Sequence, residues 1–376
     1  MIYLDNGATS LKKPKAVADA IYQAVVSEDY GNPSRGSYDQ SLNALRALME
    51  VRMTIADYFF LDDSLKVVLT PNVTYGLNFV IKSLFKAPDH IITSVSEHNS
   101  VLRPLYDLEE RGGSLSFLGL NEDFSIKIAD IEKHINENTK AIVITAASNV
   151  SGRLTDLKKV SEIARANNLI LIIDGAQTAG CLEFSMKDFD QTIYCFTGHK
   201  SLHGPQGTGG CLIKGDFDFS QVFAGGSGFD SFSKHQPNVL PELFEPGTAN
   251  VPSFLGLKAG IEELMKNPPY KKIQDLTRLL YTELKKNDKL EFYTSFTHEN
   301  GPVVSFNIKG MAANEVGQRL YDEYGLCVRT GSHCAPLFHK WVGTEDRGIV
   351  RLSLSSYNTE EEIMTAVKAI EDLSNK

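Results

Sequence analysis

The sequence lacks several features that would assign it to particular classes of protein. It contains no run of about 18 apolar residues, so we expect no transmembrane helix. The opening MIYLDNGATS has neither the basic region nor the apolar core of a secretory signal peptide. No block of Lys and Arg offsets the net charge of −9, so we expect neither nucleic acid nor a membrane as a partner.

Cysteine is scarce, and its 5 occurrences among 376 residues are scattered. An odd, scattered set is typical of reduced thiols, which predicts a cytoplasmic protein without disulfides. We interpret Cys181, Cys195 and Cys211 as small buried hydrophobic residues. Cys327 and Cys334 lie close together near the end of the chain.

Two common phosphate-binding motifs are also missing. There is no GxxxxGK[ST] loop, and no GxGxxG follows an expected strand, so nucleotide sites and a nicotinamide dehydrogenase are disfavoured. The segment 70–76 instead joins an expected strand to an expected helix. Backbone amides and the hydroxyl of Thr74 at such a helix start can bind phosphate, although Thr74 can also simply cap the helix.

Short apolar runs alternate with amphipathic stretches along the chain. Apolar runs without alternation, separated by helices, indicate a largely parallel sheet that is covered on both faces. Ligands of such sheets bind at the carboxyl ends of the strands. The expected strands are 66–70, 91–94, 141–146, 169–174, 193–196, 302–308 and 349–354. The expected helices are 42–56, 74–84, 157–168, 253–265, 269–286, 312–324 and a last one from 359, and Arg52 interrupts the apolar face of the first.

The length of the chain favours two packed domains. We expect a large α/β domain over residues 15–260 and a smaller α+β domain over 261–376, with residues 1–14 packing near the smaller one. The Gly- and Ser-rich stretch 225–233 is expected to form a mobile loop.

Asp174 and Lys200 stand at the ends of two expected strands. A carboxylate at the end of a buried run is costly unless it is paired, so Asp174 is either a helix cap or the partner of a protonated ring nitrogen. Lys200 follows an apolar run and precedes the glycines at 204 and 207. A desolvated lysine has a lowered pKa and is a nucleophile toward carbonyl groups.

Further segments complete a pattern with these residues, namely 3–10 (YLDNGATS), 97–100 (EHNS), 148–152 (SNVSG), 174–177 (DGAQ), 198–200 (GHK), 245–248 (EPGT) and 351–353 (RLS). In this order they resemble the class V, fold-type I enzymes that depend on pyridoxal phosphate. The chain is most similar to the cysteine desulfurase and selenocysteine lyase group. The resemblance runs nearly end to end. It implies an α/β fold with a mostly parallel central sheet, helices on both faces and a smaller α+β C-terminal domain.

The resemblance also implies roles in holding the cofactor. Lys200 would carry pyridoxal phosphate, Asp174 would pair with its ring nitrogen, and His98 would stack on the ring and handle protons. The remaining expected cofactor-binding residues are Asn149 and Gln177 near the 3′ oxygen, His199 on the phosphate, and Thr74, Thr197, Gly247 and Thr248. Gly247 and Thr248 would complete the phosphate site of the other subunit, so the resemblance implies a homodimer.

The segment 329–336 (RTGSHCAP) decides the expected reaction. It is similar to the cysteine loop of the group II desulfurases, in which the cysteine accepts the sulfur. Cys334 would therefore be the nucleophile, and Arg329 and His333 are expected to lie beside it as cations that favour the thiolate. Zinc is a poor alternative, because adjacent ligands at 333 and 334 do not fit a tetrahedral site. We expect no metal.

The resemblance thus predicts a pyridoxal-phosphate-dependent desulfurase that converts L-cysteine to L-alanine. The sulfur would pass as a persulfide on Cys334 to an acceptor protein. Arg351 is expected to bind the substrate carboxylate, with Arg329 and Asn32 as further substrate-binding residues. The alternatives are a selenocysteine lyase, with L-selenocysteine as substrate, and a class V aminotransferase. The loop departs from the group II pattern at Ser332 and Pro336.

Overall fold

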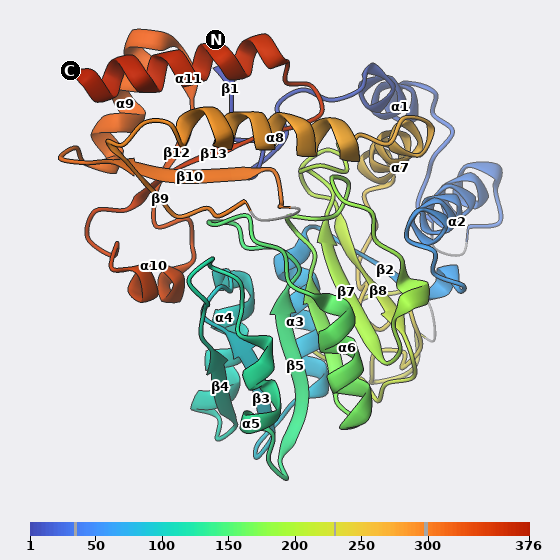
Figure 1. Cartoon of the computed structure of the whole chain (residues 1–376). Coiled ribbons are helices and arrows are strands. Elements are labelled where there is room, and N and C mark those ends of the chain that lie inside the picture. Colours follow the sequence, from blue (N-terminus) through green and yellow to red (C-terminus); the bar gives the residue numbers. More distant parts are fainter. Residues whose placement is uncertain (34–35, 229–230, 297–299) are drawn as a thin grey trace.

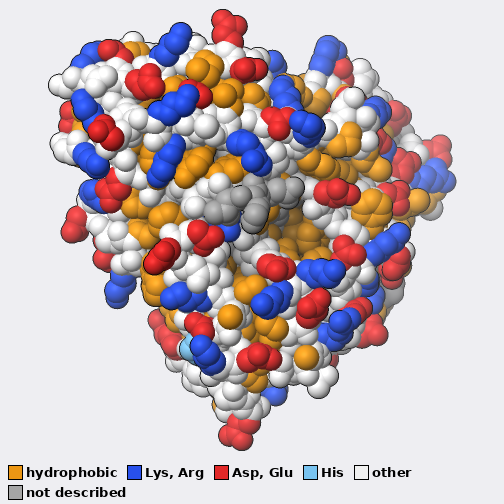
Figure 2. All heavy atoms as spheres, in the orientation of Figure 1, with side chains coloured by type: hydrophobic (Ala, Val, Ile, Leu, Met, Phe, Trp, Pro, Cys, Tyr) orange, Lys and Arg blue, Asp and Glu red, His pale blue; other side chains and the backbone are white. Residues whose placement is uncertain are grey.

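The structure is a computed structural model of residues 1–376, and it describes all of them except 34–35, 229–230 and 297–299. Among the described residues, no helix is both long and apolar enough to cross a membrane. Figure 2 shows acidic and basic side chains interspersed over one face of the molecule.

A seven-stranded sheet forms the centre of the larger part of the molecule (Figure 1). Its order is β2-β8-β7-β6-β5-β3-β4, and all neighbours from β7 to β4 are parallel. β8 runs antiparallel to both β7 and β2, a reversal that the apolar runs do not predict. The strands are β2 (Val67–Thr70), β3 (His90–Ser94), β4 (Ser114–Leu118), β5 (Thr139–Thr145), β6 (Ile170–Asp174), β7 (Thr192–Thr197) and β8 (Gly209–Lys214).

Helices cover both faces of this sheet, as predicted. Alternating side chains of β5 and β6 enter two different cores, because successive residues of a strand point to opposite faces. Ile142, Ile144 and Ile173 pack in the core that contains residues of α2, α6 and α7. Val143 and Ile172 pack in the core with α3 and α4. These helices are α2 (Asp39–Phe59), α3 (Val73–Leu84), α4 (Asn99–Glu110), α6 (Leu157–Ala166) and α7 (Val251–Lys266).

A four-stranded antiparallel sheet of order β12-β13-β10-β9 forms the smaller part, packed against α8, α9 and α11. At the N-terminus, β1 pairs in parallel with β11, and Leu4 joins the core of this part. The elements are β1 (Ile2–Tyr3), β9 (Leu290–Phe292), β10 (Val303–Ile308), β11 (Leu326–Cys327), β12 (Arg329–Gly331), β13 (Ile349–Ser353), α8 (Tyr270–Leu284), α9 (Ala313–Tyr324) and α11 (Glu360–Asn375).

The remaining helices are short or lie at the periphery. They are α1 (Lys15–Val26), α5 (Ile131–His134) and α10 (Pro336–Val342), together with the 3-10 turns Ser64–Lys66, Ile128–Asp130 and Met186–Asp188. Every helix and strand that the sequence predicts is present, with small shifts of its ends. The expected loop 225–233 has neither helix nor strand at its described positions, and residues 229–230 lie outside them. The expected domain boundary after residue 260 falls inside α7.

Candidate active site

Side chains from four consecutive strand ends of the large sheet line one small cavity of about 40 Å³. His98 follows β3, Asn149 follows β5, and Lys200 follows β7. Asp174 is the last residue of β6. The lining residues are Val73, His98, Ser100, Thr145, Asn149, Asp174, Ala176, Gln177 and Lys200. The structure therefore brings together five of the residues predicted for the cofactor.

Asp174 is almost completely buried and is held from two sides. Its Oδ1 accepts a hydrogen bond from the amide of Ala176 at 2.9 Å, and its Oδ2 accepts one from the hydroxyl of Ser100 at 3.4 Å. Burial raises the pKa of this carboxyl, while these bonds and the charge of Lys200 oppose the rise. A carboxylate placed this way can stabilise a cation that enters the cavity.

Lys200 shares the cavity with Asp174, and the positive charges of Arg351 and Arg329 on the small sheet act on it. Burial lowers the pKa of its ammonium to about 8, with Arg351 and Arg329 adding to the effect and Asp174 opposing it. A substantial fraction of the side chain is then neutral near physiological pH. A neutral amine at a strand end is what covalent attachment of a carbonyl compound requires.

Three buried polar atoms near Lys200 have no hydrogen-bond partner among the described residues. They are Oγ1 of Thr197, Nδ1 of His199 and Oδ1 of Asn149. Buried polar groups are almost always paired, so such atoms mark places where a bound group is expected. His199 is predicted to face the phosphate, Asn149 is predicted to face the 3′ oxygen of the ring, and Thr197 is predicted to bind the cofactor. The residues therefore fit pyridoxal phosphate.

His98 is fixed by contacts that determine which of its nitrogens carries a proton. Its Nδ1 accepts a hydrogen bond from the amide of Ser100 at 3.0 Å and lies 2.8 Å from the hydroxyl of the same residue. Burial, with Lys200 and Arg329 contributing, lowers the pKa of the ring to about 4. A neutral ring whose Nδ1 accepts carries its proton on Nε2, where it can be donated.

Thr74 lies on the first turn of α3 and is exposed. The helix is capped by Asn72, whose side chain accepts from the amide of Tyr75 at 3.2 Å. The capping role considered for Thr74 is therefore wrong. Its hydroxyl remains available at a helix N-terminus, which suits a phosphate.

Cys334 lines a second cavity, of about 350 Å³, which shares His98 and Ser100 with the first. Cys334 and His333 both have left-handed backbone, with φ of 55° and 48°. Two hydrogen bonds hold this strained turn: the side-chain amide of Asn149 donates to the His333 carbonyl, and the backbone amide of Asn99 donates to the Cys334 carbonyl, both at 2.8 Å.

The expectation that His333 supplies a positive charge beside Cys334 is wrong. The ring is buried, its Nε2 lies 2.9 Å from the carbonyl of Ile349, and burial lowers its pKa to about 2.

Pro336, one of the departures in this loop, is the first residue of α10. Proline suits that position because its missing N–H has no partner there. The structure places no group of three or more His, Cys, Asp and Glu side chains suited to a metal among the described residues.

Arg351 is buried, and its guanidinium already forms hydrogen bonds within the chain. Its guanidinium donates from Nη2 to Asp5 Oδ1 at 2.8 Å and from Nη1 to the carbonyl of Asn149 at 3.1 Å. Its Nε is buried without a hydrogen-bond partner among the described residues. Arg329 lies opposite Arg351 in the antiparallel register of β12 and β13. Asp5, from the opening motif, therefore orients the predicted carboxylate-binding arginine.

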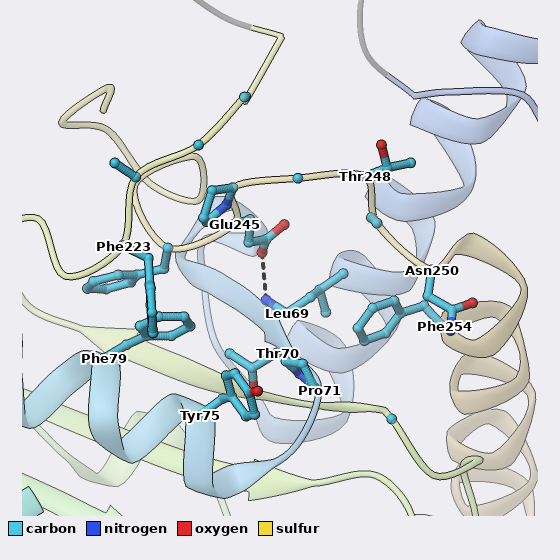
Figure 3. A pocket seen from close by; sticks show the side chains of 18 residues that line it. Leu69, Thr70, Pro71, Tyr75, Phe79, Phe223, Glu245, Thr248, Asn250 and Phe254 are labelled. Atoms are coloured by element: carbon cyan, nitrogen blue, oxygen red, sulfur yellow. Dashed lines mark hydrogen bonds between the residues drawn. The ribbon is translucent and has the colours of Figure 1, made fainter. Parts of the chain in front are cut away.

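Other predicted residues lie away from the Lys200 cavity within one chain. Asn32 is exposed, and its carbonyl accepts from the hydroxyl of Ser41 at 2.7 Å. Gly247 and Thr248 are exposed at a separate apolar cavity of about 500 Å³. Figure 3 shows Thr248 above this cavity, directed away from Leu69 on its floor.

The segment that carries Gly247 and Thr248 is anchored by Glu245. Both carboxylate oxygens of Glu245 bind Arg52, at 2.8 and 2.5 Å, and Oε1 also accepts from the amide of Leu69 at 2.6 Å (Figure 3). Arg52 donates as well to the carbonyl of Val67. This pair explains why an arginine interrupts the apolar face of α2.

The sequence motifs assigned no role to Ser100 and Glu97. Ser100 connects His98 to Asp174 and is found two residues after that histidine. Glu97 is completely buried, and burial raises the pKa of its carboxyl to about 8. Cys181, Cys195 and Cys211 are buried, as interpreted.

Comparison with known proteins decides the family. The family model for aminotransferase class-V matches residues 2–365. The chain belongs to this family. It is 30% identical over 384 residues to a probable cysteine desulfurase of Methanothermobacter thermautotrophicus, with 99% of this chain and 94% of that protein covered. It is 29% identical over 390 residues to a cysteine desulfurase of Wigglesworthia glossinidia brevipalpis, covering 98% and 92%.

Solved structures of this family agree with the fold. The apo structure of a cysteine desulfurase from Thermococcus onnurineus NA1 matches with a TM-score of 0.92 and 30% identity, over 100% of this chain and 94% of that one. The cysteine desulfurase CsdA from Escherichia coli matches with a TM-score of 0.85 and 26% identity, over 98% and 94%. The predicted class V resemblance and the predicted fold class are thereby confirmed.

Proposed function

We propose that this protein is a pyridoxal-phosphate-dependent cysteine desulfurase that converts L-cysteine to L-alanine and holds the sulfur as a persulfide on Cys334. One observation carries the proposal. The cavity of Lys200 and Asp174 adjoins the cavity of Cys334, and His98 and Ser100 line both. The proposed carrier of the cofactor and the proposed thiol nucleophile thus lie in adjoining cavities, and a histidine that can donate a proton lies between them.

The proposed cofactor site uses the residues that line the first cavity and the turns around it. Lys200 would carry pyridoxal phosphate, Asp174 would hold its ring nitrogen protonated, and His98 would stack on the ring. The phosphate would lie among the unpartnered Thr197 Oγ1 and His199 Nδ1, and the start of α3 at Thr74. Asn149 and Gln177 would contact the 3′ oxygen.

Each step then has a residue of this chain assigned to it. When bound, pyridoxal phosphate accepts the electron pair released at the substrate Cα. Arg351 binds the substrate carboxylate with its unpartnered Nε and is held in place by Asp5, with Arg329 beside it. Lys200 in its neutral form removes the Cα proton.

Cys334 completes the reaction as the sulfur acceptor. Its thiolate attacks the substrate sulfur, so an S–S bond forms as the carbon–sulfur bond breaks. The electron pair of the broken bond stays with the substrate, whose Cβ takes up a proton to become the methyl group of alanine. His98 Nε2 supplies or takes up the proton at that sulfur. The products are alanine and a persulfide on Cys334, which balances the atoms of cysteine and the thiol.

We propose a homodimer in which Gly247 and Thr248 complete the phosphate site of the other subunit, and Asn32 contacts that subunit's substrate. Three observations support this: Gly247 and Thr248 are exposed, they lie apart from the Lys200 cavity of their own chain, and the cavity beside them is largely apolar.

The five free cysteines support a cytoplasmic location. An acceptor protein is proposed to receive the sulfur. We place the division between the large and small parts after α7, with residues 1–14 in the small part, because β1 pairs with β11.

Substitution of the two half-buried cysteines tests the assigned reaction. Alanine release from cysteine should be lost in Cys334→Ala while the bound-cofactor absorbance remains, and Cys327→Ala should behave like the unaltered protein. Release of alanine by Cys334→Ala at full rate would show that the nucleophile is misassigned. A selenocysteine lyase is the rival outcome: selenocysteine would then be turned over much faster than cysteine, and Cys334→Ala would keep that activity.

A further inference from the structure

Two rows of side chains face each other across a groove beside Cys334. Residues four apart lie on the same face of a helix. On α3 these are Thr74, Asn78 and Lys82, and on α4 they are Asn99 and Arg103. The cavity between them, of about 350 Å³, is lined by Thr74, Asn78, Lys82, His98, Asn99, Ser100, Arg103, Pro104 and Cys334.

The groove carries positive charge in a protein whose net charge is −9. None of the described residues that line it is acidic. Arg103 is exposed and forms no hydrogen bond or ion pair with any described residue. Lys82 lies 3.2 Å from Asp107, which also binds Arg111, so one carboxylate is shared between two cations.

The groove continues beyond Lys82. A neighbouring cavity of about 530 Å³ shares Thr74, Asn78 and Lys82 with the first and adds Arg111. Its described lining also contains no acidic side chain. The two cavities therefore adjoin along α3, and Arg103, Lys82 and Arg111 are among the residues that line them.

The N-termini of α3 and α4 add to the positive charge of the groove near Cys334. Both α3 and α4 are 12 residues long and begin at the sheet edge near Cys334. The amide at the start of α4, on Asn99, donates directly to the Cys334 carbonyl at 2.8 Å. Helix N-termini carry partial positive charge, so an anion is also favoured at the Cys334 end of the groove.

We propose that this groove binds a low-molecular-weight thiol that carries carboxylates, and that this thiol takes the sulfur from Cys334 as a second acceptor beside the acceptor protein. The inference rests on the proposed function, because it requires a persulfide on Cys334. A cavity of about 350 Å³ is within the size range of small-molecule sites. Arg103 and Lys82 bind the carboxylates, and the thiol end reaches Cys334.

The transfer needs no external oxidant or reductant. The acceptor thiolate attacks the outer sulfur of the persulfide, a new S–S bond forms on the acceptor, and the bond to Cys334 Sγ breaks. Cys334 leaves as a thiolate and is ready for the next cysteine. The acceptor leaves as a persulfide.

The test uses the cofactor-loaded protein and two acceptors that differ in charge. The protein is first loaded with sulfur by a single equivalent of cysteine, and transfer is then timed with mercaptosuccinate, a dicarboxylate, and with uncharged 2-mercaptoethanol. We compare the unaltered protein with Arg103→Gln and with Arg46→Gln, an exposed arginine on α2. We expect Arg103→Gln to slow transfer to mercaptosuccinate by about tenfold. Transfer to 2-mercaptoethanol and transfer by Arg46→Gln should be unchanged.

Lys82→Gln provides a second variant and should also slow only the charged acceptor. Added salt should reduce the preference for mercaptosuccinate in the unaltered protein. Equal slowing of both thiols, or no effect of either variant, would overturn the inference. Absence of alanine and of a persulfide in the loading step would instead contradict the proposed function, so the two failures are distinguishable.

Discussion

The side-chain amide of Asn149 donates a 2.8 Å hydrogen bond to the carbonyl oxygen of His333. Asn149 lines the cavity of Lys200, and His333 precedes Cys334 in the strained turn. The same residue thus borders the proposed cofactor site and holds the cysteine loop. Its second N–H and its unpartnered Oδ1 remain available to the cofactor.

Asn149→Ala should release the cysteine turn. The turn contains two non-glycine residues with positive φ, and removal of one of its two anchoring hydrogen bonds costs about 1 kcal/mol. We expect iodoacetamide to alkylate Cys334 several-fold faster in apo Asn149→Ala than in the unaltered apo protein. Asn99→Ala is the matched control, because the bond from Asn99 is made by its backbone. An unchanged alkylation rate in Asn149→Ala would exclude this anchoring role.

Covalent uptake of pyridoxal phosphate should follow the ionisation of Lys200. The folded-state pKa is lowered to about 8, so below that pH the amine is protonated and unreactive. The uptake rate by apo protein, followed by borohydride reduction and intact mass, should rise through pH 8 and then level. Asp174→Asn should shift the midpoint to lower pH, because Asp174 stabilises the charged lysine. Lys200→Ala should retain no added mass.

Glu97 should make the fold less stable as pH rises. Burial raises its folded-state pKa to about 8 from an ordinary value of 4.5, so the folded state binds a proton that the unfolded state releases. The stabilisation is complete below pH 4.5 and is lost as pH rises to 8. In Glu97→Gln, the free energy of unfolding should vary less over this range, as measured in urea. Glu137→Gln, at an exposed position, should retain the slope of the unaltered protein.

The ion pair of Arg52 and Glu245 anchors the 245–248 segment and should contribute strongly to the free energy of unfolding. The side chains are only 5% and 16% exposed, and removal of one partner leaves a buried charge. Glu245→Ala should lower the free energy of unfolding by about 3–5 kcal/mol. Asp19→Ala, which breaks the exposed pair with Lys15, should cost less than about 1 kcal/mol. Similar decreases in the free energy of unfolding for both variants would contradict a larger contribution from the buried pair.

The sequence patterns predict the fold well where apolar runs are continuous. The buried strands over 141–146 and 169–174 and the helix between them are found as expected. The reversed direction of β8 is not predictable from its residues, because its side chains are buried on both faces like those of a parallel strand. Arg52 could not be explained from its own helix, since Glu245 is far away in the chain.

The candidate site likewise has some features that the sequence predicts and others that it does not. Asp174 and Lys200 are readable in the sequence as strand-end positions, and Asn149 and His98 are named by the resemblance. The structure places all four around one cavity. Charge states depend on burial by segments distant in the sequence, so the neutral state of His333 is not predictable from the sequence alone. The engagement of Arg351 by Asp5 joins the two ends of the chain, and spacing alone cannot reveal it.

Mass spectrometry of Cys334 during turnover tests the central claim most directly. The cofactor-loaded protein is given one equivalent of cysteine without an acceptor thiol, quenched, alkylated and digested. Our account predicts that the peptide containing Cys334 gains one sulfur atom in step with alanine release, and that the peptide containing Cys327 does not. Alanine formation with no added sulfur on Cys334 would contradict the account.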